Sequence, residues 1–125
     1  MLTDARTHTT LPVEDPARAK AFYADKLGLE PVSEAPAGNF YEIGDTRFLL
    51  FPTEGRPSGA HTQMGFAVDN IEVTVAALKE RGVEFEEYDF PAFDKATSIA
   101  QTGPVRAAWF KDSEGNLLGV VQLPD

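Results

Sequence analysis

The chain contains an internal repeat, and this constrains its fold more than any other feature. A helix-ending motif occurs first as Lys26-Leu27-Gly28-Leu29-Glu30 and again as Glu80-Arg81-Gly82-Val83-Glu84. An aspartate precedes both glycines at the same distance, Asp15 in the first half and Asp69 in the second. Because repeated units adopt the same local structure and bury their apolar faces together, the repeat predicts two similar modules.

Each module is expected to follow the order strand, helix and three further strands. In the first module, Asp15 can cap a helix that starts at Pro16 and ends before Gly28. We expect a single domain, 1–125, with one module at about 5–53, a linker at about 54–60 and a second module at about 61–125. In the second module we expect strands at 63–68, 83–88, 106–111 and 117–123, a helix from about 71 to 81 and a long loop at 91–104.

Composition and charge exclude several classes of function. The net charge of −9 and the scattered Lys and Arg residues argue against binding to nucleic acid, which requires a basic face. The absence of cysteine excludes disulfides and thiol chemistry. Neither a long apolar run nor a secretory signal is present, so we expect a cytoplasmic protein with no membrane partner.

Several ordered motifs resemble the vicinal-oxygen-chelate superfamily of glyoxalases, bleomycin resistance proteins and dioxygenases. They are Val13 to Tyr23 with Leu27-Gly28-Leu29, then Phe66 to Ile71 with Leu78 to Val83, and finally Trp109 to Leu117. The resemblance implies an α+β fold in which tandem βαβββ modules form a half-open cup of eight strands. It also implies a homodimer.

Many members of this superfamily bind a divalent metal through four side chains in the cup, and the resemblance places those positions here. They fall on His8, Leu50, Gln63 and Gly119. Leu50 and Gly119 offer no ligand atom and no carboxylate remains, so we expect no metal and no cofactor. A rescue site is conceivable, with His61 joining His8 and Gln63.

Strand alternation, phased on these positions, predicts which side chains line the cup. The predicted lining is apolar and suits a hydrophobic or aromatic small molecule. Phe93, from the loop, is expected to overhang the mouth, and Tyr41 and Trp109 are candidates for stacking. Trp109 could equally belong to the core, and Tyr41 could be an ordinary half-exposed strand residue. The expected ligand-binding residues are His8, Tyr41, Phe48, Leu50, Gln63, Phe93, Trp109 and Gly119.

Different classes of function remain open at this stage. The leading hypothesis is a metal-free protein that binds a small molecule without turnover, similar to the bleomycin resistance branch. The alternative is a glyoxalase-like enzyme, a lyase, isomerase or dioxygenase, with an absent or non-standard metal site. His8 is the best catalytic candidate, as a general base or hydrogen-bond donor, although the sequence slightly favours a relic or purely structural histidine.

Overall fold

The computed structural model of the chain describes residues 1–124. A short 3-10 helix, η1 (Leu2–Asp4), precedes the two modules. The first module comprises β1 (Thr9–Val13), α1 (Pro16–Leu27), β2 (Ser33–Ala35), β3 (Gly38–Ile43) and β4 (Thr46–Pro52). The second comprises β5 (Met64–Ala67), α2 (Ile71–Glu80), β6 (Phe93–Asp94), β7 (Ile99–Thr102), β8 (Val105–Lys111) and β9 (Leu117–Gln122).

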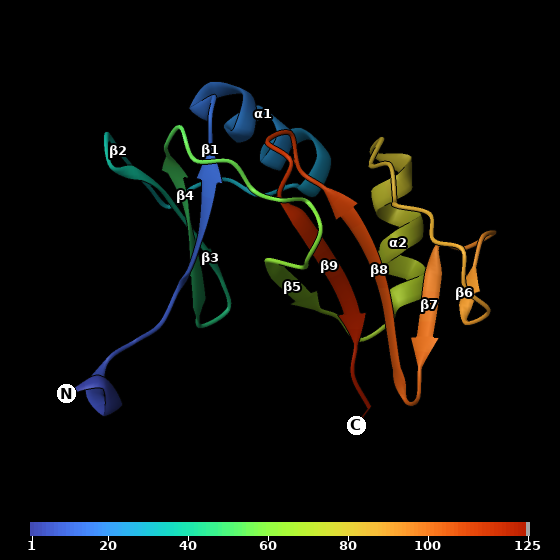
Figure 1. Cartoon of the computed structure of the whole chain (residues 1–125). Helices are drawn as coiled ribbons and strands as arrows, with labels where there is room; N and C mark the ends of the chain where they lie inside the picture. Colours follow the sequence, from blue (N-terminus) through green and yellow to red (C-terminus); the bar gives the residue numbers. More distant parts are fainter. Residues whose placement is uncertain (125) are drawn as a thin grey trace.

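The two modules form two mixed sheets with matching topology. The strand order is β1-β4-β3-β2 in the 4-stranded sheet and β5-β9-β8-β7-β6 in the 5-stranded sheet. The first strand of each module pairs in parallel with the last strand of that module, and the other pairings are antiparallel. Figure 1 shows the sheets side by side, with the edge strands β1 and β5 between them. The two similar modules predicted from the repeat, and the α+β fold implied by the resemblance, are therefore confirmed.

Local chemistry sets the ends of both helices. The Asp15 carboxylate accepts a 3.0 Å hydrogen bond from the Arg18 backbone N–H, and Gly28 ends α1 with a φ of 71°. Glycine adopts this left-handed conformation without steric strain. In α2 the capping side chain is Asn70, which accepts from the Val73 N–H at 3.1 Å.

The second module differs from the prediction on one side of its sheet. The segment 83–88 is not a strand and makes a single isolated bridge, between Phe85 and Phe110. Its alternation instead reflects burial, because Val83 and Phe85 pack against the core. The region predicted as a loop contains β6 and β7, which extend the sheet through Phe93 and Ile99.

The core lies between the sheets and the helices. It joins apolar side chains of both modules, including Leu11, Leu50 and Tyr23 from the first and Phe110, Leu118 and Val75 from the second. The Phe48 and Phe66 rings meet edge to face at 6.5 Å across the boundary between the modules. Within residues 1–124, the helices are too short and too polar to traverse a lipid bilayer.

Candidate functional site

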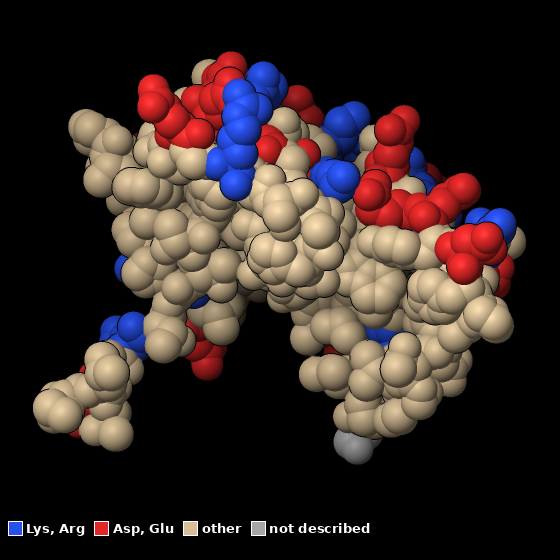
Figure 2. All heavy atoms as spheres, in the orientation of Figure 1, with Lys and Arg blue, Asp and Glu red and all other residues tan. Residues whose placement is uncertain are grey.

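Each sheet has a second face, turned away from the helices, and these two faces form the cup. Figure 2 shows the molecule hollowed between the sheets. The register of the strands identifies the side chains on the cup face, because paired residues in neighbouring strands point to the same side. Leu11 pairs with Leu50 and both are buried in the core, so the neighbouring pair, Thr10 and Leu49, faces the cup.

The prediction that Phe48 and Leu50 line the cup is wrong, as is the prediction for Tyr41. These three side chains face α1 and lie in the core, and each is at most 3% exposed. The Tyr41 and Phe48 rings stack at 4.9 Å, which leaves no face of Tyr41 free for a ligand. Burial raises the pKa of Tyr41 to about 12, with smaller effects of Glu30 and Glu34, so its hydroxyl is neutral at ordinary pH.

The first wall of the cup carries Phe40, Leu49 and Phe51 instead. Phe40 pairs with Leu49 on the cup face. Phe51, two residues after Leu49, points to the same side and is 41% exposed. The run Arg47-Phe48-Leu49-Leu50-Phe51 has apolar residues on both sides of the strand, so the sequence does not indicate which side faces the core. A sheet with two apolar faces produces such continuous runs, and this explains why the sequence misplaced the wall by one residue.

Polar groups flank the aromatic ring on this wall. The exposed His8 ring meets Phe40 edge to face at 5.4 Å, and the Arg47 guanidinium lies 5.2 Å from the centre of the same ring. Arg47 also forms a 2.9 Å ion pair with Glu42. The first wall therefore offers an aromatic surface with hydrogen-bond donors at its margin.

The second wall is formed by β5, β8 and β9. Gly65 pairs with Gly119, and Trp109 lies opposite Gly119 on β8. The indole Nε1–H donates a 2.9 Å hydrogen bond to Thr62 Oγ1. The indole atoms Cδ1 and Nε1 lie 3.5 Å from where a β-carbon on Gly119 would stand. Trp109 therefore lies on the cup face, half-buried, and not in the core.

A row of aromatic rings continues this wall outward. The Tyr88 ring lies 5.4 Å from Trp109, 5.7 Å from Phe93 and 6.2 Å from Phe90. Phe93 is buried beneath this row, whereas Phe90 is 40% exposed. Phe93 thus supports the wall and Phe90 presents its ring to solvent.

The charged residues lie mainly away from the cup. Figure 2 shows Lys, Arg, Asp and Glu gathered along the top of the view, whereas the hollow beneath is lined largely by other residues. A concave, largely uncharged surface with aromatic rings on both sides is typical of sites for apolar small molecules.

The positions that correspond to metal ligands in the superfamily do not fit a divalent metal here. Leu50 lies in the core and the Trp109 indole covers Gly119. The Gln63 amide is engaged, because its Nε2 donates to Asn116 Oδ1 at 3.0 Å and its Oε1 accepts from the Leu117 N–H at 3.3 Å. The remaining position, His8, is exposed on the first wall.

The alternative metal site, in which His61 would join His8 and Gln63, is not supported either. His61 lies in an exposed segment, where its Nδ1 is 3.0 Å from Ser58 Oγ. Over residues 1–124, no three or more His, Cys, Asp or Glu side chains come together as a metal-binding group. A single imidazole with neutral neighbours would hold a divalent cation only weakly.

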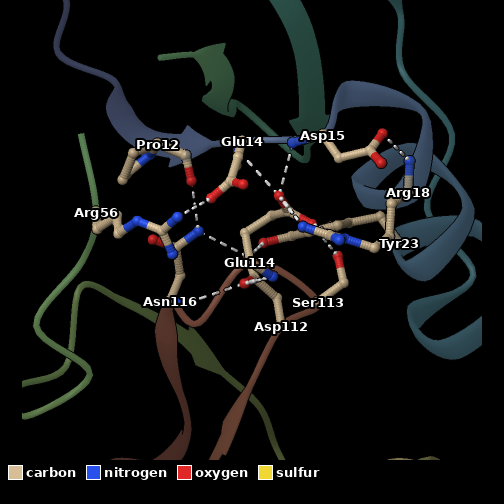
Figure 3. Close-up of polar contacts among 10 residues, drawn as sticks. All are labelled: Pro12, Glu14, Asp15, Arg18, Tyr23, Arg56, Asp112, Ser113, Glu114 and Asn116. Atoms are coloured by element: carbon tan, nitrogen blue, oxygen red, sulfur yellow. Dashed lines mark hydrogen bonds and ion pairs between the residues drawn. The ribbon is translucent and has the colours of Figure 1, made fainter. Parts of the chain in front are cut away.

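A polar network between the modules fixes the two walls relative to each other (Figure 3). The Glu114 side chain is 1% exposed and accepts hydrogen bonds from the backbone N–H groups of Glu14 and Asp15, both at 2.9 Å. Arg18 adds Nε and Nη2 donors at 2.8 and 3.1 Å, and the Ser113 hydroxyl donates at 2.8 Å. Burial alone would raise the pKa of Glu114, but these hydrogen bonds outweigh it and lower the pKa to about 2.

The same turn also places Asp112 and Asn116 beneath the first module. Tyr23 donates its hydroxyl to Asp112 Oδ2 at 2.7 Å, and burial together with the Asp112 charge raises the pKa of Tyr23 well above its usual value. Asn116 Nδ2 donates to the Pro12 carbonyl and to Asp112 Oδ2, both at 2.9 Å. The sequence indicated only a hairpin turn here, and the clue to more was its concentration of polar side chains between two apolar strands.

Comparison with known proteins supports this description of the fold. A family model of the Glyoxalase/Bleomycin resistance protein/Dioxygenase superfamily matches residues 6–120. The uncharacterized protein YurT of Bacillus subtilis (strain 168) is 30% identical, and the match covers 91% of this chain and 95% of YurT.

Solved structures with the same fold include both a binding protein and an enzyme. The antibiotic-binding protein TnmS3 from Streptomyces sp. CB03234 superposes with a TM-score of 0.68 at 23% identity, covering 97% of this chain and 98% of TnmS3. A lactoylglutathione lyase from Agrobacterium tumefaciens superposes with a TM-score of 0.67 at 21% identity, covering 95% and 93%. At these identities the likeness shows the fold alone. The chain belongs to the Glyoxalase/Bleomycin resistance protein/Dioxygenase superfamily.

Proposed function

We propose that this protein binds a flat aromatic or hydrophobic small molecule in the cup, without a metal and without turnover. The observation that carries the proposal is the presence of aromatic rings on both walls, Phe40 and Phe51 on one and Trp109 on the other. Stacking on such rings favours a flat apolar ligand. TnmS3, an antibiotic-binding protein, has the same fold, which supports the binding of a small molecule.

The small residues of the second wall provide the space that such a ligand needs. Gly65 and Ala67 on β5 face the cup and are exposed, and a β-carbon on Gly65 would come no closer than 4.0 Å to a neighbouring atom. A ligand can therefore approach the backbone of this wall while its face rests on the Trp109 indole. His8 and Arg47, at the margin of Phe40, would donate hydrogen bonds to a polar substituent of the ligand.

We further propose that the chain acts as a homodimer. The resemblance to the superfamily implies this, and the N-terminal arm, residues 1–8, is consistent with it. Every residue of the arm is exposed, including Met1 and Leu2 at 101% and 87%. Figure 1 shows the arm extending away from the body of the chain. A second copy would supply a surface for these apolar side chains.

The decisive experiment uses Trp109 as an internal reporter, because it is the single tryptophan of the chain. A panel of planar aromatic compounds is titrated into the protein while tryptophan emission is followed. We expect at least one compound to quench the emission saturably, with one compound bound per cup, and to be recovered chemically unchanged after long incubation. Catalytic consumption of the compound would contradict the proposal and favour the enzyme alternative, which His8→Ala would then test.

A matched pair of variants separates cup binding from general hydrophobic adsorption. Phe51→Ser removes an exposed ring from the first wall, and Val73→Ser removes an apolar side chain that is 64% exposed on α2. We expect Phe51→Ser to weaken binding about fivefold, because the loss of one stacked ring costs on the order of 1 kcal/mol. Val73→Ser should leave the affinity unchanged. Equal effects of the two substitutions would show that the compound does not occupy the cup.

A further inference from the structure

We propose that the protein has a second binding site, an apolar cavity behind β5, which takes a single aromatic ring or an apolar molecule of similar size. This site is separate from the cup and does not depend on the function proposed for the cup. It lies on the helix side of the sheets, where the two modules meet.

The cavity has a volume of about 160 Å³ and is lined by residues of both modules. Leu27 and Leu29 come from the end of α1, and Ile43 comes from the end of β3. Phe66 and Val68, in and just after β5, form the floor together with side chains of β8 and β9. Ile43 is 39% exposed and marks the side from which a molecule can enter.

The lining offers an incoming molecule no free polar partner among the described residues. Thr74 is the one polar side chain that lines the cavity, and its hydroxyl already donates to the Asn70 carbonyl at 3.1 Å. The pocket is open to solvent on one side, and its apolar lining gives water inside it few hydrogen-bond partners. The site therefore selects against charged or strongly polar ligands, because burying their polar groups without partners is costly.

The volume limits the size of the ligand. Apolar protein cavities of roughly 150 Å³ remain dry and accept benzene or xenon. At about 160 Å³, the half-open pocket behind β5 has room for one aromatic ring inside it, and the rest of a fused polycyclic compound would protrude into solvent. We therefore assign it to monocyclic arenes and short alkyl groups.

The cavity and the cup lie on opposite faces of the same strand. Successive side chains of a strand point to opposite sides, so Gly65 and Ala67 face the cup whereas Phe66 and Val68 face the cavity. Trp109 belongs to the cup wall and is absent from the cavity lining. Binding at the two sites can therefore be distinguished by tryptophan emission.

The test uses benzene as the probe and follows the methyl signals of the whole protein by NMR. We expect benzene to shift the methyl signals of the lining residues Leu27, Leu29 and Val68 saturably. Val121 pairs with Ala67 and therefore faces the cup, so its signal and the Trp109 emission should stay unchanged. Thr74→Leu enlarges a lining side chain and should weaken benzene binding at least tenfold. Thr74→Val, which removes the hydroxyl at constant size, should retain the affinity.

Val73→Leu provides the matched control, because it introduces the same leucine at the neighbouring, solvent-facing position of α2. It should bind benzene like the unmodified protein. Benzene shifts confined to Val121 and Trp109, or an affinity in folded Thr74→Leu equal to that of the unmodified protein, would overturn the proposal. If Thr74→Leu does not fold, the NMR titration of the unmodified protein and the benzene affinity of Thr74→Val still test the proposal.

Discussion

The indole of Trp109 lies across Gly119, and the two residues together define the second wall of the cup. Gly119 stands where the resemblance to the superfamily places a carboxylate metal ligand. With no side chain at this position, the indole lies 3.5 Å from the place of the missing β-carbon and is held by its hydrogen bond to Thr62. The position is thus occupied by an aromatic wall in place of a ligand atom.

Replacing Gly119 should disturb Trp109 in proportion to the size of the new side chain. Gly119→Glu is expected to displace the indole, to shift its emission to longer wavelength and to lower the free energy of unfolding by roughly 1–3 kcal/mol, as overpacking does. Gly119→Ala is the control, because its added carbon would meet neighbours at the ordinary contact distances of 3.4–3.5 Å. If Gly119→Glu left the Trp109 emission unchanged, the indole would not cover this position.

The Glu114 network should make stability depend on pH at the acidic end. The pKa of Glu114 is about 2 in the folded protein, below its ordinary value of 4.5. Because the folded pKa is lowered, this contribution to stability is complete above pH 4.5 and is lost as the pH falls to about 2. A shift of this size corresponds to about 3 kcal/mol. Urea unfolding between pH 7 and pH 2.5 measures it.

A matched pair of glutamine variants assigns this pH dependence. Glu114→Gln should remove the acidic loss of stability and lower the free energy of unfolding at pH 7. Glu34→Gln is the control, because Glu34 pairs with Lys20 at the surface and such pairs contribute about 0–1 kcal/mol. If the free energy of unfolding of Glu114→Gln still fell at low pH, another carboxylate would be responsible for the loss.

Asn116 should be among the least replaceable polar residues. It is fully buried and donates to both Pro12 and Asp112 while accepting from Gln63. Asn116→Ala removes the partner of the Pro12 carbonyl and of the Gln63 amide and one donor to Asp112, which keeps the Tyr23 hydroxyl. An unpaired buried group costs roughly 1–3 kcal/mol, so we expect a large drop in thermal stability. Asn39→Ala, on the first sheet, serves as the control, and equal losses in the two variants would contradict the network's importance.

Removal of the N-terminal arm tests the proposed homodimer. Deletion of residues 1–7 takes away exposed side chains and should leave the thermal stability of the isolated chain nearly unchanged. We expect the full chain to sediment as a dimer and the shortened chain to dissociate at least tenfold more readily. A full chain that sediments as a monomer at high concentration would exclude the dimer.

Much of the fold could be predicted because its signals are local. The caps at Asp15 and Gly28 and the repeat in the second module depend on backbone chemistry within a few residues, and both helices form where predicted. The strand predicted at 83–88 failed for the opposite reason. Val83 and Phe85 alternate because they are buried, and burial alone does not require a hydrogen-bonded neighbour.

Strand alternation was phased on the ligand positions that the resemblance implies, and it left Trp109 open between the core and the cup. In the structure, Trp109 lies opposite Gly119 on the cup face. The first wall has apolar side chains on both faces of β4, and only the pairing of Leu50 with Leu11 reveals which set faces the core. The Glu114 network depends on contacts between residues about 100 positions apart, beyond the reach of sequence patterns.

One titration tests whether the aromatic cup binds its ligand without a metal. A compound that quenches Trp109 is titrated into protein stripped with a chelator and, in parallel, into protein supplied with Ni²⁺, Zn²⁺, Mn²⁺ or Fe²⁺. We expect the same dissociation constant in every case and less than one-tenth of a metal ion per chain after desalting. Binding that appears only with metal, or one tightly held ion per chain, would contradict it.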